Sequence, residues 1–321
     1  MIAELTKPRL AGVPAWPDGW TAAIVGCGSA GSRVARLLVD LGVPAAQLRG
    51  YDNRPVVASR WPAAVALTVD HDGHSLLKAM IGDVWFICTP VWVRPQYYAA
   101  AVHQARAIFA EKPLAKAVSA VESSVVEAEA RGLVTQTGYC WRWHPAALAA
   151  RAWLRRQQLS GLTAHAVCAV NMHGWPGSPH SYGDALLELS HELDTVRFCL
   201  GSGRVVAVAP GSLWSLLIAH ETGATSTVDL RGEYQGYFRE LTLMGNADRF
   251  EWSTSAFVDA GRFGDAGYPG SWSPDDMYRA ELADFLRAAI DGQAVRCSWR
   301  DGLEIVRWCD QARTLRLASN T

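Results

Sequence analysis

Residues 22–31, which read AAIVGCGSAG, decide the fold of this chain. A short apolar run typical of a β-strand leads directly into a Gly-x-Gly-x-x-Gly pattern, and a helical pattern follows over residues 32–41. In such a unit the first glycine allows the tight turn, the second lets the backbone approach a pyrophosphate, and the third brings the helix against the strand. The N-terminus of the helix offers N–H groups and the positive end of its dipole to the phosphates. We therefore predict a dinucleotide site that includes Gly26, Gly28, Ser29, Ala30 and Gly31.

A carboxylate at the end of the second predicted strand indicates which dinucleotide binds. Asp52 ends the run 48–52 about 20 residues after the last glycine, where a carboxylate accepts hydrogen bonds from the ribose hydroxyls. An acid at this place favours NAD. Arg54 could pair with the 2′-phosphate of NADP or lie on the adenine, so NADP stays open, and Asn53 between them is included in the predicted site. The alternative interpretation is a set of ordinary turn glycines and a solvated aspartate.

Short apolar runs alternate with helical patterns up to residue 145, which is the signature of a parallel sheet with helices on both faces. The predicted strands are 22–25, 48–52, 65–69, 84–89, 107–110 and 133–138, and helical patterns begin after Gly31, at Gly73, at Pro95 and at Ser119. We therefore expect an α/β, doubly wound Rossmann domain over residues 1–145.

The pattern changes after Pro145 to longer runs that alternate apolar and polar residues, as in a largely antiparallel open sheet. We expect helices over 146–158, 186–200, 275–289 and 301–317, strands over 163–172, 205–212, 224–232, 239–244 and 249–253, and a loop over 261–273. These elements predict an α+β domain over residues 146–321 that binds substrate and mediates oligomerisation. We expect its last helix to pack back toward the first domain.

The composition is that of an ordinary globular protein, with 50% hydrophobic residues and a formal net charge of −1 over 321 residues. Lysines and arginines are scattered, which argues against nucleic acid as a partner. The apolar stretches are interrupted and too short to span a membrane, and residues 1–20 lack the apolar run of a signal peptide. Seven widely spaced cysteines without a Cys-x-x-Cys pair indicate reduced core residues, and we expect a cytoplasmic protein.

Three further segments extend the glycine pattern into a family signature: ICTP at 87–90, EKPL at 111–114 and HELD at 191–194. Together they resemble the glucose-fructose oxidoreductase and inositol dehydrogenase family, called Gfo/Idh/MocA, and the likeness covers nearly the whole chain. It implies an NAD(P)-dependent oxidoreductase of two domains. The resemblance adds these residues to the cofactor site: Cys88, Thr89, Pro90, Glu111, Lys112 and Pro113.

Lys112 follows a predicted parallel strand at the sheet edge where open α/β sheets bind their ligands. A lysine there can hydrogen-bond the reacting hydroxyl or carbonyl oxygen and stabilise its alkoxide character while hydride moves. The resemblance implies the same role, and a cis peptide bond before Pro113 would fit it. Taken without the resemblance, a lysine at a strand end is more often a solvated surface charge.

His191 and Asp194 lie three residues apart in a predicted helix and therefore share nearly one face. Histidine is the natural proton shuttle near neutral pH, and Asp194 could orient the imidazole. In the commonest pattern of the family an aspartate stands four residues before the histidine, but this chain has Leu187 there and Glu188 three before. We include Glu188 among the catalytic candidates, and whether it takes over the role of that aspartate stays open.

Substrate contacts are expected from residues that leave the last Rossmann strand and from the loop before the His191 helix. The candidates, which would suit a domain interface equally well, are Lys112, Tyr139, Arg142, His144, Trp175 and His191. No metal site is expected, because no His-Glu-x-x-His or clustered Cys/His spacing occurs. The absence of a Gly-x-Ser-x-Gly elbow argues against a hydrolase.

These features predict an enzyme that interconverts a secondary alcohol and a ketone on a sugar, a sugar derivative or a cyclitol. One alternative keeps the fold and reduces an imine or enone of secondary metabolism, since the loop 171–183 looks shorter than in relatives of the subgroup that carries the Glu188 pattern. The other alternative is a non-catalytic dinucleotide or sugar sensor. We expect a homodimer or homotetramer formed through the C-terminal sheet.

Overall fold

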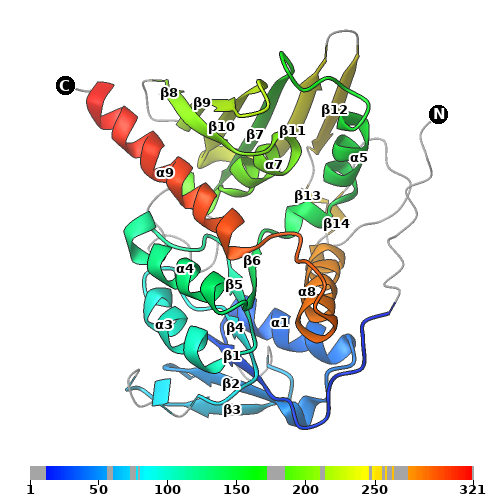
Figure 1. Cartoon of the computed structure of the whole chain (residues 1–321), viewed down its shortest axis with the longest axis vertical. Coiled ribbons are helices and arrows are strands. Elements are labelled where there is room, and N and C mark those ends of the chain that lie inside the picture. Colours follow the sequence, from blue (N-terminus) through cyan, green and yellow to red (C-terminus); the bar gives the residue numbers. More distant parts are fainter. Residues whose placement is uncertain are drawn as a thin grey trace. The chain divides into compact units, whose positions relative to one another are not determined.

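The computed structural model describes residues 12–55, 61–72, 77–78, 80–171, 185–209, 214–245, 248–254, 257–258, 262–263 and 274–319. They form two compact units, each with its own sheet (Figure 1). The described residues of the first unit lie within Arg9–Tyr139 and Tyr278–Leu303, and those of the second within Cys140–Met277 and Glu304–Thr321. The sequence predicts a single boundary near residue 145, whereas residues 278–303 of the structure group with the first unit.

The first unit is built on a six-stranded parallel sheet with the order β3-β2-β1-β4-β5-β6. Its strands are β1 (Ala22–Val25), β2 (Leu48–Asp52), β3 (Ala66–Val69), β4 (Val84–Ile87), β5 (Ala107–Glu111) and β6 (Val134–Gly138). The order reverses between β1 and β4, so the segments after these two strands flank the switch point where doubly wound folds bind ligands.

Helices cover both faces of this sheet, with α1 and α8 on one side and α3 and α4 on the other (Figure 1). The helical elements are α1 (Ser29–Asp40), η1 (Ala45–Gln47), α3 (Arg94–Gln104), η2 (Val118–Ala120), α4 (Glu122–Ala130) and α8 (Pro274–Asp291). The helix expected from Gly73 begins outside the described residues. The rings of Phe86 and Phe109 each lie within 6 Å of Phe285 of α8, which explains why this late helix belongs to the first core.

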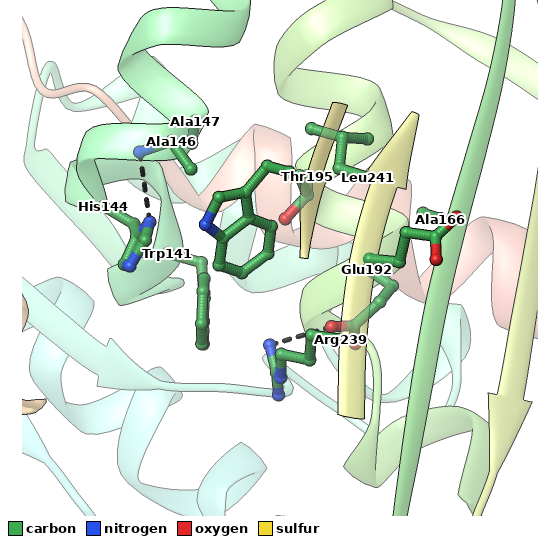
Figure 2. A pocket seen from close by; sticks show the side chains of 11 residues that line it. Trp141, His144, Ala146, Ala147, Ala166, Glu192, Thr195, Arg239 and Leu241 are labelled. Atoms are coloured by element: carbon green, nitrogen blue, oxygen red, sulfur yellow. Dashed lines mark hydrogen bonds and ion pairs between the residues drawn. The ribbon is translucent and has the colours of Figure 1, made fainter. Parts of the chain in front are cut away.

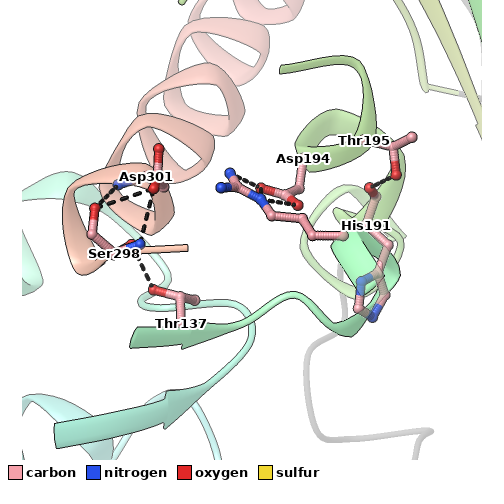
Figure 3. A network of polar contacts seen from close by, with 7 residues as sticks. Thr137, His191, Asp194, Thr195, Ser298 and Asp301 are labelled. Carbon is pink, nitrogen blue, oxygen red and sulfur yellow. Dashed lines mark hydrogen bonds and ion pairs between the residues drawn. The ribbon is translucent and has the colours of Figure 1, made fainter. Parts of the chain in front are cut away.

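The helix α9 (Trp299–Ser319) begins with a cap against β6. Asp301 Oδ2 accepts hydrogen bonds from the Ser298 N–H and hydroxyl at 2.9 and 3.1 Å, and Ser298 Oγ accepts from the Asp301 N–H, as in a capping box (Figure 3). A Cβ on Gly302 would lie 2.4 Å from Thr137 Oγ1, so only glycine lets the helix approach β6 this closely.

The second unit holds a mixed, mostly antiparallel sheet with the order β12-β11-β7-β10-β9-β8, in which only β7 and β10 run parallel. Its strands are β7 (Thr163–Asn171), β8 (Gly203–Val208), β9 (Trp214–His220), β10 (Thr225–Arg231), β11 (Glu233–Met244), β12 (Arg249–Thr254), β13 (Phe257–Val258) and β14 (Arg262–Phe263). The two sheets together confirm the predicted fold class. The strand β9 is absent from the prediction, and residues 262–263, expected in a loop, pair with β13.

Helices pack on one face of this second sheet, where α7 lies against β7 and β10 (Figure 1). The helical elements are η3 (Cys140–Trp143), α5 (Pro145–Leu154), α6 (Ala185–Glu188) and α7 (His191–Leu200), joined by the residues of α9 from Glu304 onward. The predicted single helix over 186–200 is wrong in one respect, because Leu189 and Ser190 form a turn between α6 and α7. Trp308 of α9 donates its indole N–H to the Gly203 carbonyl at 2.9 Å.

Candidate active site

The glycine loop has the close packing that its pattern predicts. Gly26 has a φ of +85°, and a Cβ there would lie 2.7 Å from the backbone nitrogen of Thr89. A Cβ on Gly31 would lie 2.0 Å from the Gly26 carbonyl oxygen. By contrast, a Cβ on Gly28 would meet no described atom within 4 Å. The loop is therefore tight at its first and third glycines and open at its second.

The open side of the loop suits a phosphate group. The helix α1 begins at Ser29 with no side-chain cap and no acidic residue in its first turn, so no side chain of the helix itself competes for its first N–H groups. Thr89, beside the loop, buries a hydroxyl that has no hydrogen-bond partner among the described residues. A cradle at Gly28 and an unsatisfied polar atom nearby both fit a dinucleotide.

Asp52 lies at the end of β2 and is buried beside the loop. Its Oδ2 accepts a hydrogen bond from the Cys27 N–H at 2.7 Å, and its Oδ1 accepts from the Arg54 N–H at 2.9 Å. Each carboxylate oxygen can accept a further bond, so a ribose hydroxyl can still be received here. Asn53 and Arg54 are exposed. The carboxylate therefore fixes the loop as well as offering an acceptor.

Lys112 follows the carboxyl end of β5, the same edge of the sheet at which the glycine loop follows β1. Lys112 is partly exposed, and Glu111 Oε2 accepts from its backbone N–H at 3.2 Å. The peptide bond between Lys112 and Pro113 is cis, as the resemblance implied. The first unit thus brings the glycine loop, Asp52, Thr89 and Lys112 to one edge.

Cys88 also lies at this edge of the sheet. Burial, and then the negative charge of Glu111, raise the pKa of the Cys88 thiol well above its ordinary value, so Cys88 is no thiolate nucleophile. Trp92, in the segment after β4, is 47% exposed, and the Lys116 ammonium lies 5.4 Å from the centroid of its ring.

Arg94 is a residue of this edge that sequence reasoning missed. It opens α3 and is 2% exposed, and it donates from Nε to the Thr89 carbonyl at 2.7 Å. Its Nη1 donates to the carbonyls of Glu111 and Pro113. A lone arginine at a predicted helix start carries no signal of such partners, because they come from segments far along the chain.

In the second unit, Arg142 and Asp194 form a buried bidentate ion pair (Figure 3). Arg142 Nε lies 3.1 and 2.9 Å from the two carboxylate oxygens, and Nη2 lies 2.6 Å from Oδ1. The predicted role of Asp194 is to orient an imidazole, and that of Arg142 is to bind substrate. The geometry gives both residues an additional role, because the pair ties η3 to α7.

His191 opens α7 and Glu188 closes α6, and both side chains are buried. The turn at Ser190 separates them, so the spacing of the two residues is not that of one continuous helix. Thr195 donates its hydroxyl to the His191 carbonyl at 2.8 Å, which closes the first turn of α7 (Figure 3).

The remaining predicted substrate residues have different environments. Tyr139 is fully buried. His144 is 2% exposed and accepts at Nδ1 a hydrogen bond from the Ala146 N–H at 3.1 Å, which makes it the N-cap of α5. Trp175 lies outside the described residues.

His144 lines a small cavity within the second unit, of about 20 Å³, which is room for about one water molecule (Figure 2). Its ring and those of Trp141 and Trp252 lie 4.7 to 5.5 Å from one another. Arg239 lies 4.3 Å over the Trp141 ring and pairs with Glu192 at 2.8 Å. Sequence reasoning missed this second buried pair, because Arg239 falls in no motif and the HELD segment that contains Glu192 does not indicate its partner.

Within the part of the chain that the structure describes, no group of three or more His, Cys, Asp or Glu side chains could hold a metal ion. None of the helices formed by the described residues is long and apolar enough to cross a membrane.

Comparison with known proteins reveals similarity along almost the whole chain. No protein-family model matches it. The chain is 24% identical over 302 residues to an inositol 2-dehydrogenase of Paracoccus denitrificans strain Pd 1222, covering 87% of this chain and 88% of the relative.

Solved structures match more completely in fold than in sequence. GenD2 from gentamicin A biosynthesis, solved with NAD, superposes with a TM-score of 0.75 over 97% of both chains at 16% identity. Levoglucosan dehydrogenase, solved with NADH and levoglucosan, superposes with a TM-score of 0.73 over 93% of this chain and 97% of its own at 17% identity.

The two sheets and the glycine loop define a fold of two units, the first of which is Rossmann-like. This fold is that of the Gfo/Idh/MocA oxidoreductases, as the resemblance implied, and the chain shares it with GenD2.

Proposed function

We propose that the protein is an NAD-dependent oxidoreductase, with NADP as a possible second cofactor, that interconverts a secondary alcohol and a ketone on a sugar, a sugar derivative or a cyclitol. One observation carries the proposal: an open cradle at Gly28 and the residue Lys112 both lie at the carboxyl edge of the parallel sheet. A binding protein needs the cradle alone, whereas a dehydrogenase also needs a group that stabilises charge on the reacting oxygen, and a lysine can take this role.

The residues of the first unit hold the cofactor. The N–H groups at the start of α1 bind the pyrophosphate, Asp52 accepts from a ribose hydroxyl, and Thr89 satisfies its buried hydroxyl on the bound dinucleotide. When bound, the nicotinamide supplies the hydride chemistry.

Proton handling falls to the protein. Lys112 donates a hydrogen bond to the reacting oxygen and stabilises its alkoxide character. His191 takes the hydroxyl proton in oxidation and returns it in reduction. Glu188, three residues before His191, is the last residue of α6, and its side chain is buried. Arg142 and Asp194 hold η3 and α7 together, so the segment that carries His191 is fixed.

The substrate class rests on the relatives. One of them is an inositol dehydrogenase and another a levoglucosan dehydrogenase solved with its sugar, so a polyhydroxylated ring is the class we assign.

The test pairs cofactor binding with turnover. Titration of NADH, followed by its fluorescence, should saturate, and a panel of cyclitols and sugars should include an oxidised substrate. Lys112→Ala should retain NADH binding and lose turnover by about 100-fold or more. Lys116→Ala, an exposed lysine four residues along, is the matched control and should keep turnover. Absence of NADH and NADPH binding would refute the proposal, and undiminished turnover of Lys112→Ala would refute the role of the lysine.

We propose further that the protein acts in the cytoplasm as a homodimer or homotetramer joined through the second sheet. All seven cysteines are free, which suits a reducing compartment. Leu217 and Met244, 38% and 48% exposed, lie on the sheet face opposite the helices. Light scattering of the wild type and of Leu217→Lys with Met244→Lys tests the assembly, and a monomeric wild type would contradict it.

A further inference from the structure

We infer that Arg94 is a positioning residue that fixes the catalytic Lys112 relative to the cofactor-binding segment at Thr89. The inference rests on the role proposed for Lys112. Neither the glycine pattern nor the EKPL segment points to it, because the connection lies in hydrogen bonds to backbone atoms.

The contacts of Arg94 join two strand ends that are far apart in sequence. Its Nε donates to the Thr89 carbonyl at 2.7 Å, just beyond β4, and its Nη1 donates to the carbonyls of Glu111 and Pro113, at the end of β5. The latter two carbonyls lie on either side of Lys112. The backbone through the lysine is therefore fixed before and after it by one guanidinium.

These hydrogen bonds are strong ones. Arg94 is 2% exposed, so the interactions are little weakened by water, and the donor carries a charge. The Thr89 and Pro113 carbonyls lie beyond the ends of β4 and β5, and a buried carbonyl without a partner is costly. The planar guanidinium can serve carbonyls in several directions at once, which an ammonium on a flexible stem cannot do with the same geometry.

A second residue on the same face of α3 supports the arrangement. Tyr98, four residues after Arg94, donates its hydroxyl to the Leu114 carbonyl at 2.7 Å. The helix thus holds the segment from Glu111 to Leu114 at successive points.

Thr89, which accepts a hydrogen bond from Arg94, borders the glycine loop. The Thr89 backbone nitrogen lies so close to Gly26 that a Cβ on the glycine would be 2.7 Å from it. Arg94 therefore connects the backbone on either side of Lys112 to the backbone that borders the cradle at Gly28. Catalytic groups must be placed to within a fraction of an ångström, and a displacement of about 1 Å can lower the rate about 100-fold.

The first experiment does not depend on activity. Hydrogen–deuterium exchange of wild type and Arg94→Lys, both full chain without cofactor, should show faster exchange by about 10-fold or more in residues 111–117 of the variant. Arg106→Lys, the same change at an arginine whose side chain is 64% exposed, is the matched control and should match the wild type. Unchanged exchange of residues 111–117 in Arg94→Lys would overturn the inference, and if that variant does not fold, Arg94→Gln replaces it in the same comparison.

The second experiment measures turnover with the substrate found in the panel. In Arg94→Lys, kcat should fall about 100-fold while the dissociation constant of NADH changes less than 3-fold, and the deuterium isotope effect on hydride transfer should rise. A merely structural defect would lower the amount of folded protein without raising the isotope effect. A kcat within 2-fold of wild type would overturn the inference. An inactive wild type that binds no dinucleotide would instead refute the proposed function, while the exchange result would still decide whether Arg94 positions the turn.

Discussion

Asp194 accepts hydrogen bonds at both carboxylate oxygens from one guanidinium, that of Arg142, with Nη2 2.6 Å from Oδ1 and Nε 2.9 Å from Oδ2. The two side chains are only 1% and 3% exposed. Removing one member of such a pair leaves a buried charge without compensation, which costs about 3–5 kcal/mol. We therefore expect Asp194→Ala to lower the free energy of unfolding by this amount in urea titrations.

The matched control removes both charges together. In Arg142→Met with Asp194→Leu no charge is left buried, so most of the lost stability should return. If the double variant were as unstable as Asp194→Ala, the loss would come from packing rather than from an uncompensated charge.

The second and third glycines of the loop should respond differently to alanine. Gly28→Ala meets open space, so we expect the melting temperature to stay within about 2 °C while NADH binding weakens about 10-fold or more, since the methyl group occupies the cradle. Calorimetry and NADH fluorescence measure the two effects. Unweakened NADH binding by Gly28→Ala would place the phosphates elsewhere.

Gly31→Ala is the structural counterpart. Its Cβ would lie 2.0 Å from the Gly26 carbonyl oxygen, so α1 must shift, and overpacking of this kind costs about 1–3 kcal/mol or more. We expect a lower melting temperature even without cofactor. A melting temperature equal to that of the wild type would mean that the helix moves away at no cost.

Asp52→Asn should change the choice of cofactor more than the fold. The amide oxygen can still accept from the Cys27 N–H, although the Arg54 N–H then loses its acceptor, and the charge that binds the ribose and repels a 2′-phosphate is lost. We expect NAD to bind about 10-fold more weakly and NADP to bind no worse, as measured by titration of both reduced cofactors. A ratio of the two affinities equal to that of the wild type would contradict this role.

His220 should make the stability of the second unit depend on pH. Burial lowers the pKa of His220 below its ordinary 6.5, although its contact with the Gly201 carbonyl at 3.0 Å opposes the shift. The unfolded chain then binds more protons than the folded chain just below pH 6.5, so stability falls as the pH drops from 6.5 toward the lowered value and is constant above.

His220→Gln removes this titration. We expect the difference in unfolding free energy between pH 8 and pH 5.5 to shrink, together with a loss of about 1 kcal/mol at pH 8 from the hydrogen bond to Ser226. Urea titrations at both pH values provide the measurement, and an unchanged pH difference would assign the dependence to another group.

The sequence predicted the parallel sheet closely because its strands are short and most of them are buried, although all four residues of β3 are exposed. In β1 and β4 every residue is buried, so a continuous apolar run is sufficient as a signal. The strand β9 was harder, since a buried histidine ends it and Leu216, Leu217 and Ile218 form a continuous run, which hides the alternation of a half-buried strand.

A residue of the candidate site was predictable from the sequence where it belongs to a motif. It was unpredictable where its partners lie far along the chain. Gly28 and Lys112 follow strands at one sheet edge, so their neighbourhood follows from the topology. Arg94 and Arg239 carry no local pattern, and only the folded chain brings their partners within reach. The break at Ser190 likewise escapes periodicity, because a turn of two residues barely disturbs it.

Trp92 lies on the sheet edge that carries Lys112, and it is 47% exposed, whereas the described tryptophans buried in the two units are at most 9% exposed. A quencher dissolved in the buffer therefore reaches this indole far more readily than those of the cores. The neighbouring Lys116 attracts an anion, so iodide should collide with the indole more often than a neutral quencher of similar size. The rim of the site thus contains its own fluorophore, through which ligand arrival can be followed without a label.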